Sequence, residues 1–180
     1  AEIKIDLALQ KIAGIWGGLK FEYTPFKATG VNILLQPGEV YEALDDNEVV
    51  LQNMMGNRFM GFFEATITDW KGKLGTVRAV LEVLLEVQRA WCSLESIFLG
   101  SEDIREQLPE DAKRFDGIDA SFKEQMGDAS QTPNPLDACL KDASATIEAL
   151  DDHEVALQTM MGNRFMAVFE TQIVTWKTKH

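Results

Sequence analysis

The sequence is poor in the side chains that most often carry chemistry. Its 180 residues contain two histidines and two cysteines. Cys92 and Cys139 stand far apart, which favours reduced, partly buried thiols over a metal-binding or redox pair. His153 is followed by Glu154, but Leu157 occupies the position of the second histidine of a zinc-binding helix. We therefore expect no metal site and no catalytic cysteine.

Motifs for phosphate binding and for nucleophilic catalysis are absent as well. The Gly72-Lys73 pair has Ile67 where a phosphate-binding loop needs its first glycine. No GxSxG, CxxC or EF-hand calcium spacing occurs. The sequence thus predicts a chain that is not an enzyme and has no cofactor.

Basic charge and long apolar runs are scarce. The formal net charge of -12 argues against binding to nucleic acid or to an anionic membrane surface. No apolar run approaches the roughly 20 residues that span a bilayer. The first residues, AEIKIDLALQKIAGIW, carry charges within their apolar pattern, unlike a signal peptide. Since 46% of the residues are hydrophobic, a sizeable core can form, and we expect a cytosolic protein.

One stretch of the sequence occurs twice. Residues 43–73 and 149–179 are identical at 21 of 31 positions, which makes them an internal repeat. In each copy, apolar residues recur every three or four positions, as on one face of an amphipathic helix. Most differences between the copies fall on the opposite side. The face in the first copy comprises Leu51, Met55, Phe59, Phe63, Ile67 and Trp70, and the repeat face comprises Leu157, Met161, Phe165, Phe169, Ile173 and Trp176.

Each copy is expected to be a single helix. Asp45-Asp46 and Asp151-Asp152 stand where such a helix would begin, so their carboxylates are interpreted as caps for unpaired backbone N–H groups. Met54-Met55 and Met160-Met161 are interpreted as deformable core side chains. Gly56-Asn57 lowers helix propensity by about 1 kcal/mol for the glycine, but we expect the helix to continue through it.

The pattern outside the repeat predicts more helices and a single β-hairpin. Residues 5–19 have helical spacing, whereas residues 19–35 contain two extended runs around a turn. A second long helix should follow Gly72 to Gly75 and pack antiparallel to the first copy. Its core face carries Trp91, Leu94 and Phe98.

The second half of the chain begins with short helices. Ser101 should cap a helix that ends near Pro109, and a further helix should follow. Residues 127–135, GDASQTPNP, are the one convincing linker. The sequence thus predicts a mainly α-helical, elongated bundle with one small β-hairpin near the N-terminus. Its parts are a helical subdomain over residues 1–126, the linker, and a helical segment over residues 136–180 that repeats residues 43–73.

The stretch from Val77 to Asp119 contains specific motifs. These are VQR at 87–89, Trp91, LESIF at 94–98, SEDI at 101–104 and QLP at 107–109. In order and spacing the stretch strongly resembles the linker region of dynein heavy chains, closest to the axonemal outer-arm type. With the first copy of the repeat and the strand at Phe21 to Tyr23, the resemblance covers about residues 1–135.

This resemblance implies a mechanical function. In that family the linker is a mostly helical rod that precedes the ring of AAA modules, and its swing produces the power stroke, while ATP binds in the ring. The chain would then be a non-catalytic lever segment of a microtubule motor protein, which transmits the conformational change of the ATPase ring. Its partners would be the AAA ring and tail of the heavy chain, and the microtubule only indirectly. The implied location is the cytoplasm and cytoskeleton, in the axoneme of a cilium or flagellum.

The resemblance ends near Cys139, where the repeated block returns. A fusion of two related segments, a local duplication and an incorrectly assembled sequence would each explain this, and we favour fusion. The alternative function is a helical scaffold or assembly module. In that case the repeated helix, residues 150–177, would mediate self-association with a second chain.

Overall fold

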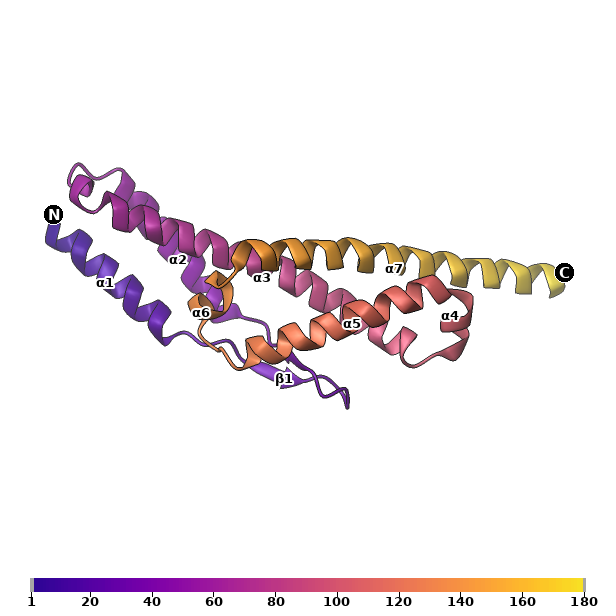
Figure 1. Ribbon diagram of the computed structural model, residues 1–180. Coiled ribbons are helices and arrows are strands. Elements are labelled where there is room, and N and C mark those ends of the chain that lie inside the picture. Colours follow the sequence, from indigo (N-terminus) through magenta and orange to yellow (C-terminus); the bar gives the residue numbers. More distant parts are fainter. Residues whose placement is uncertain (1, 180) are drawn as a thin grey trace. The chain divides into compact units, whose positions relative to one another are not determined.

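The computed structural model describes the backbone of residues 2–179 and the side chains of residues 2–163. Within these limits the chain is mainly α-helical, with one small antiparallel sheet near the N-terminus, which confirms the predicted fold class (Figure 1). The elements are α1 (Glu2–Gly18), β1 (Tyr23–Pro25), β2 (Asn32–Leu34), α2 (Gly38–Met55), the 3-10 helix η1 (Met60–Phe62), α3 (Glu64–Phe98), α4 (Glu102–Gln107), α5 (Pro109–Ser130), α6 (Pro135–Leu140) and α7 (Ala143–Lys179).

The chain forms two compact units. Unit 1 contains residues 1–82 and 126–146, and unit 2 contains residues 83–125 and 147–180. The sequence predicted a division at a linker over residues 127–135. In the structure, α5 continues through Ser130, and the loop between α5 and α6 is limited to residues 131–134.

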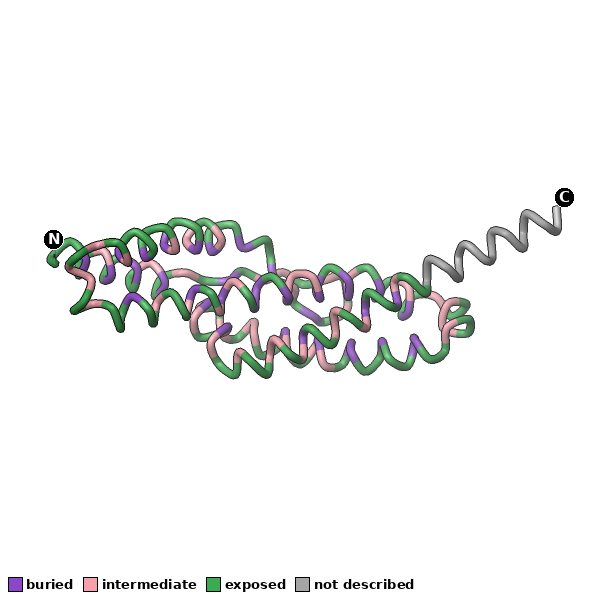
Figure 2. Tube along the Cα trace, turned by 90° about the horizontal axis from the view of Figure 1, so that it is seen from above, coloured by how far each residue is buried: buried purple, intermediate pink, exposed green. Residues whose placement is uncertain are grey.

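Helix α1 buries one face in unit 1. Four of the five residues on its predicted face are buried, namely Ile5, Leu9, Ile12 and Trp16. The fifth, Leu19, follows the end of the helix and is half-buried. The helix packs against α2 and α6. In Figure 2 short buried stretches alternate with exposed ones along the helix that begins at the N-terminus, as expected for a helix with one buried face.

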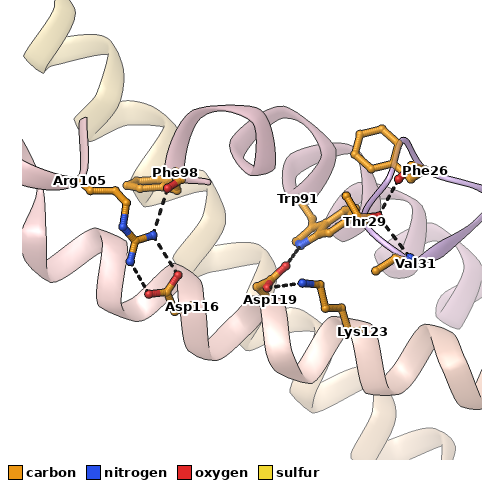
Figure 3. A network of polar contacts seen from close by, with 9 residues as sticks. All are labelled: Phe26, Thr29, Val31, Trp91, Phe98, Arg105, Asp116, Asp119 and Lys123. Atoms are coloured by element: carbon orange, nitrogen blue, oxygen red, sulfur yellow. Dashed lines mark hydrogen bonds and ion pairs between the residues drawn. The ribbon is translucent and has the colours of Figure 1, made fainter. Parts of the chain in front are cut away.

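The β-hairpin is confirmed, with shorter strands than the sequence predicted. Tyr23 pairs with Leu34 in the antiparallel register. In the turn, Thr29 Oγ1 donates to the Phe26 carbonyl over 2.6 Å and accepts from the Val31 N–H over 3.2 Å (Figure 3). A two-stranded hairpin alone is only marginally stable, and here neighbouring backbone supports it.

That support comes from the loop between α5 and α6. The Phe21 N–H donates to the Pro133 carbonyl over 2.7 Å, and the Tyr23 hydroxyl donates to the Ala129 carbonyl over 3.2 Å. Asn134 Nδ2 donates to the Trp16 carbonyl over 2.8 Å, while its Oδ1 caps α6 by accepting from Leu136 and Asp137. The loop therefore fixes α1, the hairpin and α6 together within unit 1.

The predicted helix start at Asp45-Asp46 is wrong. Helix α2 begins at Gly38 and continues through both aspartates to Met55. No residue between Gly38 and Asp46 interrupts the helix, so the aspartates do not stand at its start. The second copy behaves likewise, since Asp151-Asp152 lies inside α7.

The predicted position of the helical hairpin is also wrong. The chain leaves helix at Gly56-Asn57, passes through η1 and re-enters helix at Glu64, whereas Gly72 and Gly75 lie inside α3. Two glycines in a helix cost about 1 kcal/mol each. Burial of Leu74 and Val77 beside them offsets this cost, because both side chains are fully buried.

Unit 2 is built around the second part of α3 and around α5. Residues spaced by three or four positions supply its core, as expected for two packed helices. From α3 these are Val87, Trp91, Leu94 and Phe98, from α5 Ala112, Phe115, Ile118 and Phe122, and from α7 Leu150, Leu157 and Met160.

Candidate functional site

The best-defined group of interactions joins α3, α4 and α5 inside unit 2. Trp91 and Phe122 have ring centroids 4.7 Å apart, and Phe98 stacks on Phe115 at 5.2 Å. From the first pair to the second, the residue number rises on α3 and falls on α5. The two helices therefore pack antiparallel. Aromatic pairs of this kind contribute about 0.5–1.5 kcal/mol beyond the area that they bury.

A buried carboxylate lies beside the first aromatic pair. Asp119 Oδ1 accepts a hydrogen bond from Trp91 Nε1 over 2.8 Å, and its Oδ2 lies 2.9 Å from Lys123 Nζ (Figure 3). Burying a carboxylate is costly unless it is paired and hydrogen-bonded. Both conditions are met in the observed register of α5 on α3.

An arginine clamp lies beside the second aromatic pair. Arg105, in α4, forms two hydrogen bonds with the Asp116 carboxylate, of 3.0 and 2.6 Å, and a third with the Phe98 carbonyl at 3.0 Å (Figure 3). The hydrogen bond from Arg105 holds the pKa of Asp116 below its usual value. The clamp thus connects the last residue of α3 to α4 and α5, and its positive charge suits a helix C-terminus.

The start of α4 follows the sequence prediction. Ser101 Oγ accepts from the Ile104 N–H over 3.4 Å, which confirms Ser101 as the N-cap, and the helix ends at Gln107, before Pro109. Gly100 precedes it, and a Cβ atom there would lie 2.4 Å from the Ser96 carbonyl oxygen. Only glycine fits this approach of the chain to the end of α3.

Unit 1 contains a second clamp, between α2 and α3. Arg78 lies 2.7 Å from Asp45 and 3.1 Å from Glu48, and these hydrogen bonds raise the pKa of the guanidinium. Lys71 Nζ donates to Gln52 Oε1 over 2.9 Å. Asp45 therefore pairs across the helical hairpin rather than capping a helix. Beside these contacts lies an open groove of about 590 Å³, which is lined by Asp45, Glu48, Val49, Gln52 and Lys71.

The predicted core residues have two different environments. Leu51, Ile67, Trp91, Leu94 and Phe98 are fully buried. Met55, Phe59, Phe63 and Trp70 are half-buried, because the break over residues 56–63 ends the helix on which they were expected to align. On the repeat face, Leu157 is buried and Met161 is half-buried. Phe165, Phe169, Ile173 and Trp176 lie outside the described side chains.

The titratable groups of the described residues form no metal-binding cluster. No three histidine, cysteine, aspartate or glutamate side chains gather there in a way that could hold a metal ion. Burial raises the pKa of Cys139 to about 12, which keeps its thiol protonated at neutral pH. Burial lowers the pKa of His153, which lies within α7 and not at the helix start that we expected. None of the helices in the described part is long and apolar enough to cross a membrane.

Sequence reasoning missed Arg78, Arg105, Asp116 and Asp119 as interaction partners. Only the spacing of Asp45 and Glu48 hinted at a shared partner, because residues three apart lie on one side of a helix. Arg105 and Asp116 belong to different helices, and no periodicity of one helix predicts a contact between two.

The fold and these contacts define a mainly helical packing segment. Comparison with known proteins gives its family. The family described as dynein heavy chain, N-terminal region 2, matches residues 1–145. The chain belongs to the dynein heavy chain family.

Several relatives have a similar degree of identity. The chain is 44% identical over 137 residues to a ciliary dynein beta chain of Tripneustes gratilla and 45% identical over 133 residues to human dynein axonemal heavy chain 9. It is 41% identical over 144 residues to a flagellar outer-arm dynein beta chain of Chlamydomonas reinhardtii. These matches cover 76%, 74% and 78% of this chain but 3% of each relative. The second copy of the repeat follows the part that the family matches.

Proposed function

We propose that this chain is a non-catalytic, force-transmitting segment of a ciliary or flagellar dynein heavy chain. Its place would be the linker, which passes the conformational change of the ATPase ring to the rest of the motor. Its partners would be the AAA ring and the tail of the heavy chain, and it would act on the microtubule only indirectly. The axoneme, as part of the cytoskeleton, would be its location.

The observation that carries this proposal is the fixed register of α5 on α3. A segment that transmits force along its helices must resist sliding of one helix past the next. A slide by one helical turn, about 5.4 Å, would separate Asp119 from Trp91 and would separate Arg105 from the end of α3. It would also misalign both aromatic pairs, so sliding would break several contacts at once.

A chimeric outer-arm heavy chain that carries residues 1–145 in place of its own matching segment provides the test. Arg105→Ala should reduce microtubule gliding velocity while the ATPase rate is retained, because force would no longer be transmitted efficiently. The matched control is Arg89→Ala, since Arg89 makes only an exposed pair with Glu86 three residues away, and such pairs contribute little. Equal losses of velocity and ATPase rate, or no loss of either, would contradict the proposal. Saturable ATP binding by the isolated chain would contradict its non-catalytic part.

A second candidate, self-association through residues 150–177, is favoured by the repeat itself. The first copy supplies both helices of a hairpin, so a second copy could offer the same side chains to another chain. Light scattering after size exclusion tests this candidate. A strict monomer at high protein concentration would rule it out.

A further inference from the structure

The repeat contains one short sequence in two conformations. Residues 54–57 and 160–163 are both Met-Met-Gly-Asn. In the first copy α2 ends at Met55, and the chain turns at Gly56-Asn57. In the second copy Gly162 and Asn163 lie within α7. Local sequence alone cannot distinguish two identical tetrapeptides, so contacts or flanking residues must decide between turn and helix.

The turn in the first copy is stabilised by its own asparagine. Asn57 Oδ1 accepts from the Phe59 N–H over 2.8 Å. The Asn57 carbonyl accepts from the Met60 N–H over 3.1 Å and begins the short 3-10 turn. Asparagine side chains commonly stabilise turns in this way, because they replace a backbone acceptor.

The same asparagine in the second copy has a different partner. Asn163 Nδ2 donates to Asp111 Oδ2 over 2.8 Å. Asp111 lies in the first turn of α5 and is only 9% exposed. A hydrogen bond to a buried carboxylate is stronger than one between neutral groups. The bond ties Asn163 to the first turn of α5 in the observed state, in which α7 is continuous.

The flanking sequence of the second copy favours the helix over the turn. Gly61 of the first copy corresponds to Ala167, and Val50 corresponds to Ala156. Alanine is the best helix former, and glycine to alanine changes helix preference by about fivefold. The combined effect of these two differences on helix stability is small, so the second copy can still form the turn.

We propose that Gly162-Asn163 is a hinge in α7, and that Asp111 holds it closed as a continuous helix. When the Asn163 bond is released, the chain turns there as it does at Gly56-Asn57. The residues beyond then return along the exposed side of α7, which carries Val155 and Gln158. Leu157 and Met160 stay buried in unit 2.

The two states differ in one measurable distance. In the first copy, Gln52 and Lys71 are hydrogen-bonded across the hairpin. Their counterparts are Gln158 and Lys177. In a continuous helix, 19 residues at 1.5 Å each separate these positions by about 28 Å. In a hairpin, the helix axes would lie about 8–10 Å apart.

Spin labels at Gln158→Cys and Lys177→Cys make this distance accessible to pulsed electron resonance. Cys92→Ser and Cys139→Ala remove the native thiols. A second labelled pair, at Gln52→Cys and Lys71→Cys, supplies the short distance of a known hairpin. Dilution with unlabelled protein separates contacts within one chain from contacts between chains. The wild type should give the long distance.

The variants are compared in an Ala167→Gly background, which restores the glycine of the first copy. Asp111→Ala should raise the ratio of short to long distance at least about tenfold, the amount expected for a hydrogen bond to a carboxylate. Asn163→Asp should act in the same direction, because like charges repel Asp111 while a carboxylate oxygen can still stabilise the turn. Asn163→Ala should give no short component, since it removes the turn acceptor together with the bond.

The opposite behaviour of the two Asn163 variants distinguishes a hinge from simple destabilisation. A merely structural bond would respond in the same direction to Asn163→Ala, Asn163→Asp and Asp111→Ala. The proposal is overturned if Asp111→Ala and Asn163→Asp, each with Ala167→Gly, retain only the long distance. It is also overturned if a short distance disappears on dilution with unlabelled protein.

Discussion

Replacing Phe115 by alanine should severely destabilise unit 2. The side chain is fully buried and stacks on Phe98 with ring centroids 5.2 Å apart. Truncating a buried phenylalanine costs about 3–5 kcal/mol, because both the transferred surface and the remaining cavity contribute. For a chain of this size each kcal/mol lowers Tm by about 2–4 °C. We therefore expect Tm to fall by roughly 10 °C.

The chain offers a matched control for the same chemical change. Phe62, in η1, is 87% exposed. Phe62→Ala should change the free energy of unfolding by no more than about 0.5 kcal/mol, as is usual for surface positions. Circular dichroism during heating measures both variants. Hydrogen exchange then locates the change, which should appear in residues 83–125 for Phe115→Ala.

A double-mutant cycle isolates the contact between the two rings. Phe98→Leu and Phe115→Leu keep apolar volume at both positions while they remove one ring each. Their coupling free energy should be about 0.5–1.5 kcal/mol. If Phe115→Ala were as mild as Phe62→Ala, or if the coupling were zero, the packing of α3 on α5 as described would be refuted.

Two further predictions concern glycine and the buried thiol. Gly100→Ala should lower Tm, because its Cβ would lie 2.4 Å from the Ser96 carbonyl oxygen. Gly117→Ala should instead stabilise the protein by about 1 kcal/mol, because Gly117 lies inside α5 with open space around it. Equal changes of Tm in thermal melts of the two variants would refute this reasoning. Burial raises the pKa of Cys139 in the folded protein from 9.0 to about 12. The stability that the buried, protonated thiol contributes is therefore complete below pH 9 and is lost as the pH rises toward 12. In urea denaturation, the free energy of unfolding should fall more steeply with pH over that range in the wild type than in Cys139→Ala. The same slope in both proteins would contradict this prediction.

The spacing of apolar residues predicted individual helix faces well. Ile5, Leu9, Ile12 and Trp16 are all buried on α1, because a helical period fixes which side chains share a face. The fold class followed from the same signal. A period within one helix carries no information about where two helices meet, and Arg105 with Asp116 therefore could not be paired from sequence.

Helix boundaries were the less predictable part, and the glycines explain why. Gly56 ends a helix, while Gly72 and Gly75 do not. Each has the same intrinsic cost in a helix. The outcome depends on what surrounds it: Leu74 and Val77 bury their side chains around the second pair, whereas Asn57 supplies a hydrogen bond that favours a turn at the first.

The two copies of the repeat use equivalent positions with different partners. Asp45 and Asp151 occupy the same place in the repeated sequence, yet Asp45 pairs with Arg78 across a helical hairpin, whereas Asp151 lies within the uninterrupted α7. The buried positions are used in both copies, since Leu44 and Leu51 correspond to Leu150 and Leu157. The apolar face is therefore set by the local sequence and is kept. The two copies contact different partners on other helices, Arg78 at Asp45 in one copy and Asp111 at Asn163 in the other, and both partners lie outside the repeat.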